Sequence, residues 1–166
     1  ALDEVLIPQA QQPGCHALTR PYNLSMGLPL RDYPVVGSAL KLFGLLAQRS
    51  SLDDLGQLLR SPFLAGWDEE QTPRALLDAR LRENGELNLT LRTLRYHASQ
   101  VDEPYACPRL LEQLDRWQQL ARSCPAQDSP AQWSERFAGL LQAIGWAAGR
   151  GLSSEEYQTI EAWQGV

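Results

Sequence analysis

Lysine is almost absent from this sequence, and its scarcity excludes several kinds of chemistry. Of the 15 basic residues, 14 are arginine and one is Lys41. A P-loop needs a lysine between glycine and serine or threonine, so that the ammonium group reaches the phosphates of a nucleotide. Lys41 stands between two leucines instead, and the residue two positions before it is Ala39 rather than the acid of a restriction-like nuclease core. No other lysine is present to form a Schiff base.

Cysteine is also scarce and unpatterned. The three cysteines, Cys15, Cys107 and Cys124, are an odd number without paired spacing. This favours a reduced, cytosolic setting over a disulfide framework. No two potential ligands show the short spacing of a zinc site, and no G-x-S-x-G turn occurs. We therefore expect no metal, no cofactor, no small-molecule substrate and no catalytic residue in this chain.

Long apolar runs are missing as well. The longest apolar stretch, residues 35–47, is interrupted by two glycines, a serine and Lys41, whereas a membrane-spanning helix needs about 18 apolar residues or more. No charged segment followed by an apolar one opens the chain, so no secretory signal is expected. We predict a cytoplasmic protein without membrane contact. Because the first residue is alanine and the last helical pattern is still running at residue 166, we interpret the chain as a fragment of a larger protein.

Strand-forming residues are few, which predicts the fold class. Valine and isoleucine together occur eight times, whereas leucine occurs 29 times. Leucine favours helices and β-branched residues favour strands. A chain of this length can bury about 69% of its surface, enough for one core without disulfides or metals. We predict an all-α fold, an irregular bundle of about six or seven helices over residues 34–166, preceded by an extended, Pro- and Gln-rich arm over residues 1–33.

Local patterns place the first helices. The apolar residues between 35 and 46 cover most of a helix circumference, which predicts a central, buried helix. Ser50 or Ser51 is positioned to cap a second helix, with acids in its first turn. Thr72 followed by Pro73 predicts the start of a third helix, because proline is favoured at the first helical position.

The last two helices have the strongest start signals in the sequence. Residues 87–98 are ambiguous, since leucines alternate up to residue 91 while the following spacing suits a helix capped by Thr90; we favour the helix. The stripe between 110 and 120 predicts an amphipathic helix. Ser129 with Gln132, and Ser153 with Glu156, match the capping-box pattern at the starts of the last two helices. The acidic clusters at 53–54, 68–70 and 155–156 are interpreted as helix-start charges rather than as acid/base catalysts.

Charge and aromatic residues indicate only weak binding candidates. The net charge of −5 provides no overall electrostatic footprint for nucleic acid. Arg60, Arg92 and Arg95 are candidates for contact with phosphates or an acidic surface, against the alternative of a solvated arginine face.

Aromatic residues add two more candidates. Of the five tryptophans, Trp117, Trp133 and Trp163 fall on apolar stripes and are expected in the core. Trp67 is expected in a loop after Phe63. We therefore consider Phe63 and Trp67 for contact with a partner or a neighbouring domain.

Several blocks of sequence resemble passages in helicase-like proteins of bacterial DNA repair. Residues 21–30 read PYNLSMGLPL and continue through Tyr33-Pro34-Val35-Val36 into the apolar helix, and residues 58–64 read LLRSPFL. These blocks are similar to the inactivated superfamily I helicases, related to the AddB/RecC type of helicase–nuclease subunit. Further family-like blocks follow the same order over most of the chain: residues 2–8, residues 79–83, the helix at Trp133 and residues 154–158.

The resemblance implies a helical insertion subdomain of a degenerate helicase lobe, in a parent that commonly carries a C-terminal nuclease domain. The arm over residues 1–33 would then link to the missing lobe. No ATP-binding or nuclease residue can be transferred to this chain, because the matching motifs are missing from it. The implied partners are DNA, through the parent protein, and the neighbouring helicase-like and nuclease domains.

Two hypotheses of function follow from these observations. The first is a non-catalytic module of a DNA repair or recombination protein that helps to hold DNA or to dock neighbouring domains. The alternative is a protein–protein interaction scaffold that never touches nucleic acid. The resemblance favours the first hypothesis, whereas the physical properties of the residues permit both.

Overall fold

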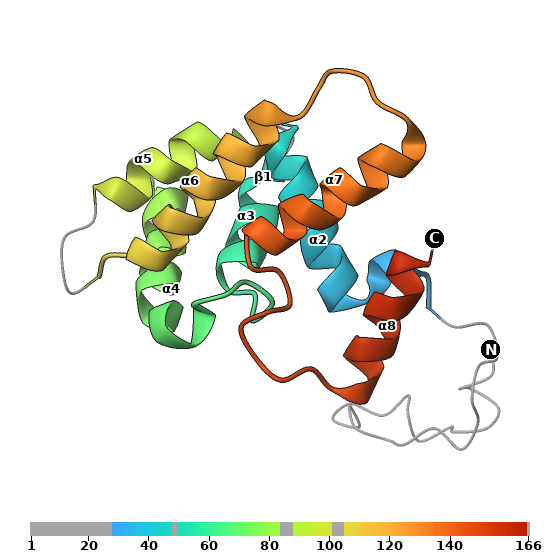
Figure 1. The fold of residues 1–166 in the computed structure, drawn as a ribbon. Helices are drawn as coiled ribbons and strands as arrows, with labels where there is room; N and C mark the ends of the chain where they lie inside the picture. Colours follow the sequence, from blue (N-terminus) through green and yellow to red (C-terminus); the bar gives the residue numbers. More distant parts are fainter. Residues whose placement is uncertain (1–27, 48–49, 84–87, 101–104, 166) are drawn as a thin grey trace, which may run out of the picture.

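The computed structural model of this chain describes residues 28–47, 50–83, 88–100 and 105–165. These ranges hold seven α-helices, one short 3₁₀ helix and two strands of two residues each (Figure 1). The prediction of an all-α bundle of about six or seven helices is therefore confirmed. Most of the predicted arm, together with most of the first block of the helicase resemblance, lies outside the described residues.

Short connections join the elements in chain order. In chain order, the helices and strands are η2 (Leu30–Asp32), α2 (Pro34–Leu46), β1 (Ser50–Ser51), α3 (Leu52–Leu59), α4 (Trp67–Glu83), β2 (Asn88–Leu89), α5 (Leu91–Ser99), α6 (Pro108–Ser123), α7 (Pro130–Ala143) and α8 (Ser154–Gln164). The two strands pair antiparallel, with Ser50 opposite Leu89. No helix in these ranges combines the length and the apolar character that crossing a bilayer requires.

Helix α2 is the centre of the fold, as its apolar sequence predicts. It contacts η2, α3, α8 and β1, and Figure 1 shows it between the group formed by α4, α5 and α6 on one side and α8 on the other. Its buried side chains come from most of its circumference: Val35, Val36, Ser38, Ala39, Leu42 and Leu45. A helix that buries so many directions at once is stable only when neighbours surround it.

The predicted helix caps are present at four starts. The Ser51 hydroxyl accepts a hydrogen bond from the Asp54 backbone N–H at 3.1 Å, and the Thr90 hydroxyl accepts one from the Thr93 N–H at 3.2 Å. Both capping boxes form, because the side chains of Gln132 and Glu156 each reach back to the backbone N–H of the capping serine. These four helix starts could be predicted from sequence because each cap depends on residues only three positions apart.

The third helix starts close to where the Thr72-Pro73 pair predicts it, just after a kink inside α4. Helix α4 also includes a turn before the kink that begins at Trp67, so Trp67 opens a helix instead of lying in a loop. Pro73 lies inside this helix and lacks the N–H that would bond to the carbonyl four residues earlier. The chain accommodates this at Glu70, whose backbone leaves the helical region with φ −112° and ψ 18°. The Thr-Pro signal therefore marks the first turn of the helical segment that follows the kink.

The segment after α7 is joined to the first turns of α2 by a tryptophan. The Trp146 indole N–H donates to the Val35 carbonyl and to the Ser38 hydroxyl, each at 3.0 Å. Beside it, the Ala65 N–H donates to the Gly145 carbonyl at 3.0 Å and the Ala147 N–H donates to the Phe63 carbonyl at 2.7 Å. Segments about 80 residues apart in sequence thus share one short backbone pairing, which closes the single core.

Candidate functional site

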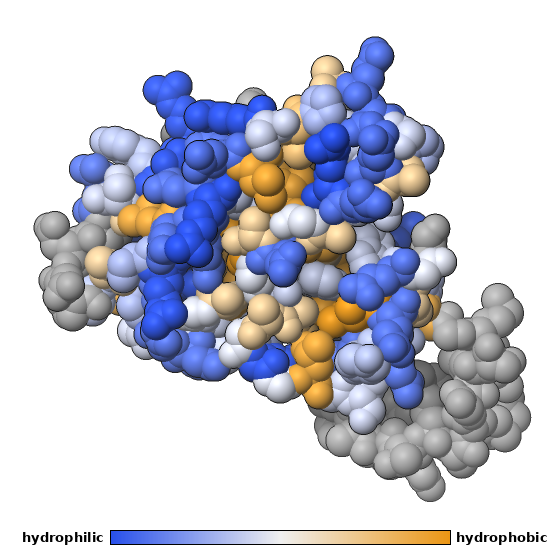
Figure 2. Space-filling view, in the orientation of Figure 1, coloured by the Kyte–Doolittle hydropathy of each residue, from blue (hydrophilic) through white to orange (hydrophobic). Residues whose placement is uncertain are grey.

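An open groove of about 1270 Å³ lies between four helices, α2, α5, α6 and α7. Its walls come from the C-terminal ends of α2 and α6, one face of α5, and one face of α7. In the space-filling view, apolar surface shows between the polar outer faces of α6 and α7 (Figure 2). We call it the arginine–aromatic groove, lined by Phe43, Leu45, Leu46, Ala47, Thr90, Leu91, Arg92, Thr93, Tyr96, His97, Gln118, Ala121, Arg122, Cys124, Trp133, Phe137 and Leu140.

Aromatic rings from three helices line this groove in two groups. Phe43 of α2 meets Phe137 of α7 edge to face at 5.0 Å between ring centroids, and Phe137 stacks on Trp133 at 5.4 Å and 29°. On the opposite wall, Tyr96 lies edge to face with His97 at 5.5 Å. Two of these rings remain open to solvent, since Tyr96 is 61% exposed and Phe137 43% exposed.

The charge of the groove differs in sign from that of the whole chain. The chain carries 20 acids and 15 basic residues, yet among the described lining residues none is acidic and two are arginines. Arg92, on the first turn of α5, and Arg122, on the last turn of α6, are both exposed. Neither forms an ion pair with any described residue, so both guanidinium groups are available to an incoming anion.

Two acids, one on α6 and one in the connection that follows it, are paired with arginines. Asp115 of α6 pairs with Arg95 of α5. Asp128, in the connection between α6 and α7, accepts hydrogen bonds from Arg136, the closer at 2.5 Å and the Nε bond at 2.7 Å. Because each carboxylate faces its own arginine, the local field near the groove is less negative than the net charge of −5 suggests.

Of the five candidate contact residues, only Arg92 lines the groove. Arg95 lies beside it, but its guanidinium bridges from α5 to Asp115 and to the Gln118 side chain on α6. Gln118 itself lines the groove. Arg95 therefore holds two walls together, a structural role that the exposed-arginine interpretation did not foresee.

The other three candidates lie elsewhere. Arg60 ends α3 and pairs with Asp78, whose side chain is only 6% exposed. Phe63 is buried at 5% exposure, with the Arg150 guanidinium 5.0 Å above its ring. Arg60 and Phe63 line a second hollow of about 470 Å³ that also includes Lys41. Trp67 is half-buried at the start of α4.

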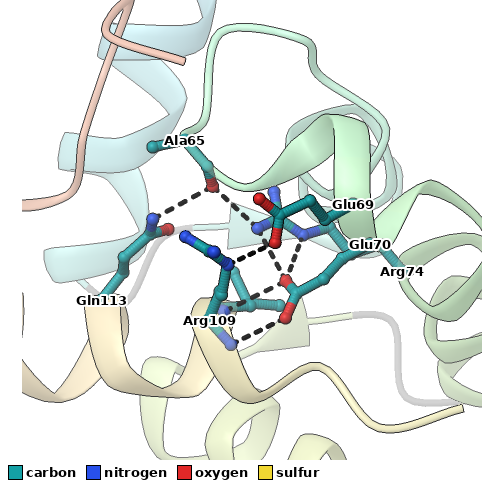
Figure 3. A network of polar contacts seen from close by, with 7 residues as sticks. Ala65, Glu69, Glu70, Arg74, Arg109 and Gln113 are labelled. Carbon is teal, nitrogen blue, oxygen red and sulfur yellow. Dashed lines mark hydrogen bonds and ion pairs between the residues drawn. The ribbon is translucent and has the colours of Figure 1, made fainter. Parts of the chain in front are cut away.

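A buried polar network, which the sequence pattern did not reveal, connects α4 to α6 (Figure 3). Glu70 was interpreted as a helix-start charge of its own helix. Its carboxylate instead accepts hydrogen bonds from the backbone N–H groups of Arg109 at 2.7 Å and Leu110 at 3.1 Å. Helix α6 has no capping side chain at Cys107, so Glu70 satisfies its free N–H groups from another helix.

Arg74 completes this network. It exposes none of its side chain and donates to Glu70 at 2.8 and 3.0 Å and to the Ala65 carbonyl at 2.9 Å. Gln113 of α6 donates to the same carbonyl at 3.0 Å. The Glu70–Arg74 pair is thus a structural link that positions α6. The C-terminal half of this helix holds Gln118 and Arg122, which line the groove.

The cysteines differ in environment. Cys107 is buried at 1% exposure, and burial raises the pKa of its thiol to about 11, with the nearby Glu70 carboxylate adding to the rise and Arg74 opposing it. Cys124 is half-buried on the wall of the groove, where its thiol faces the Leu120 carbonyl at 3.5 Å. Within the described part of the chain, no three histidine, cysteine or acidic side chains gather in a way that would hold a metal ion.

Several groove residues escaped the sequence analysis. Arg122, Tyr96 and Phe137 carry no motif, and Trp133 was expected in the core although it is half-buried on the groove wall. Trp117 does lie in the core, with no exposed surface. An unpaired arginine cannot be told from a paired one in sequence, because pairing depends on which helices come together.

No family model, curated protein or solved structure matches this chain. The structure shows an all-α domain with an open groove. The helicase resemblance stays a prediction.

Proposed function

We propose that this chain is a non-catalytic helical subdomain of a degenerate, cytoplasmic helicase-like DNA repair protein, and that it holds DNA in the arginine–aromatic groove. The observation that carries the proposal is the charge of the groove, where Arg92 and Arg122 have no partner among the described residues and no described lining residue is acidic. The sequence resemblance to inactivated superfamily I helicases supports the same conclusion independently. Neighbouring helicase-like and nuclease domains of the parent are the expected protein partners.

The two arginines suit phosphate ligands chemically. A guanidinium group presents a planar fork of N–H donors that matches two phosphate oxygens, and it stays charged at every physiological pH. A chain with a net charge of −5 repels DNA overall, so contact depends on a local region where the sign is reversed. The groove is such a region in the described structure.

Titration of fluorescent oligonucleotides with the 166-residue chain tests the proposal. Two phosphate contacts predict about a sevenfold loss of affinity for single strands between about 50 and about 200 mM salt. Arg92→Ala and Arg122→Ala should each weaken binding about tenfold and flatten the salt dependence. Arg80→Ala is the matched control, because Arg80 is exposed on α4, outside the groove, and has no ion pair with a described residue.

Two outcomes would contradict the proposal. Absence of binding at low salt would remove the DNA-holding role and leave the protein–protein scaffold as the better hypothesis. An equal loss of affinity in Arg80→Ala and Arg92→Ala would show that binding follows total charge rather than the groove.

A further inference from the structure

We infer that the arginine–aromatic groove takes unpaired nucleotides, whose bases stack on its rings, rather than duplex DNA. The inference rests on the proposed function and adds the strandedness of the ligand to it. The supporting observation is that exposed aromatic side chains and two arginines without an ion pair to any described residue line one groove.

The exposed rings favour a ligand with a flat, apolar surface. Tyr96 is 61% exposed and Phe137, although it stacks on Trp133, is 43% exposed, so both side chains keep apolar surface in solvent that burial would stabilise. They belong to α5 and α7, on different walls of the groove. A base entering the groove therefore meets an aromatic surface from more than one direction.

A duplex cannot use these rings. Its base faces are already covered by the neighbouring base pairs, and only its phosphates and groove edges are accessible. An unpaired nucleotide exposes both faces of its base, and stacking on an aromatic side chain is worth about 1–3 kcal/mol per base. Arginines alone would serve either form of DNA, whereas arginines beside open rings favour the single strand.

The size and polarity of the groove fit a short stretch of strand. Its volume of about 1270 Å³ exceeds the usual small-molecule site of about 300–1,000 Å³, so more than one nucleotide fits. Arg92 and Arg122 come from α5 and α6, and phosphates that follow one another along a strand could reach both. The remaining polar groups, the Thr90 and Thr93 hydroxyls, the Gln118 amide and the His97 ring, offer few base-specific contacts, and we expect little sequence preference.

The test compares a thymine oligonucleotide with a duplex of the same length, using the full chain. We expect the single strand to bind at least about tenfold more tightly, and Tyr96→Ala to weaken single-strand binding about tenfold while leaving duplex binding unchanged. Tyr96 is largely exposed, so its removal should not unfold the protein. Tyr157→Ala is the control, because Tyr157 is similarly exposed at 56% but lies on α8, away from the groove.

Cys124 supplies a second readout on the groove wall. In a Cys15→Ser background, the single strand should slow alkylation of Cys124, while Cys107 stays unreactive because it is buried at 1% exposure. The duplex should protect Cys124 much less.

Failure of this inference can be told from failure of the proposed function. If Arg92→Ala weakens binding but Tyr96→Ala does not, or if single strand and duplex bind equally, the groove holds DNA without stacking and the inference is overturned. If a saturating single strand leaves Cys124 fully reactive, the strand lies elsewhere. If neither form of DNA binds, both proposals are overturned together.

Discussion

The Arg74 guanidinium, which exposes none of its surface, is held 2.8 Å from the carboxylate of Glu70 one helical turn earlier. A charge buried this completely is stable only when it is paired and hydrogen-bonded. The same carboxylate also caps the first turn of α6. One acidic residue thus pairs with a buried cation and caps the N-terminus of a second helix, and the position of α6 depends on it.

Removal of the Glu70 charge should be severely destabilising. Glu70→Gln leaves Arg74 as an uncompensated buried charge and should lower the free energy of unfolding by about 3–5 kcal/mol. Urea denaturation followed by circular dichroism measures this. Glu69→Gln is the control, because Glu69 pairs with Arg109 at 59% side-chain exposure and an exposed pair is worth at most about 1 kcal/mol.

The double variant Glu70→Leu with Arg74→Met should be more stable than Glu70→Leu alone, since it removes the stranded charge as well. Equal losses in the Glu70 and Glu69 variants would show that the network contributes little.

Two glycines should respond to alanine with opposite signs. Gly145 adopts φ +69°, and an added Cβ would lie 2.5 Å from the Ala65 Cβ. Gly145→Ala should therefore destabilise the protein by about 1–3 kcal/mol. Gly139 lies inside α7 with nothing within 4 Å of an added Cβ, so Gly139→Ala should stabilise it by about 0.5–1 kcal/mol. Thermal unfolding of both variants tests the pair, and shifts of the same sign would contradict this account.

The thiol of Cys107 should make the protein less stable in alkali. Burial raises its pKa from an ordinary value of 9.0 to about 11, so the folded state keeps a proton that the unfolded state has lost. Its contribution to stability is complete below pH 9 and is lost as the pH rises towards 11. The difference in unfolding free energy between the wild type and Cys107→Ala should shrink over this interval, and a constant difference would contradict the prediction.

The capping box of α8 should weaken in acid. The Ser153 backbone N–H donates to Glu156 at 2.8 Å and, together with Arg150, lowers the pKa of that carboxyl. A lowered pKa means that the contribution is present above the unfolded pKa and is lost as the pH falls through the folded one. Glu156→Gln keeps a capping amide but not the charge, so its stability should depend less on pH below about 5. Unfolding curves of both proteins across the acid range measure the effect, which would be refuted by parallel profiles.

The candidate site was predictable only in part, as a comparison of Arg92 with Arg95 shows. Arg92 was identified as a possible contact because it is a basic residue on the polar face of a predicted helix, and it lies in the groove. Arg95, three residues later, is also a basic residue of the same helix, but it pairs with Asp115 on α6. No local pattern separates the two, because the difference arises only when α5 packs against α6.

The sequence by itself determined the all-α class, the central position of α2 and four of the helix starts. These depend on composition, on periodicity and on hydrogen bonds between residues three positions apart, all of which are local. Tertiary structure alone decided that Glu70 caps a different helix, and that α2, α5, α6 and α7 form a groove with no acid among its described lining residues. Each of these joins residues tens of positions apart, and contacts at that separation depend on how the helices pack.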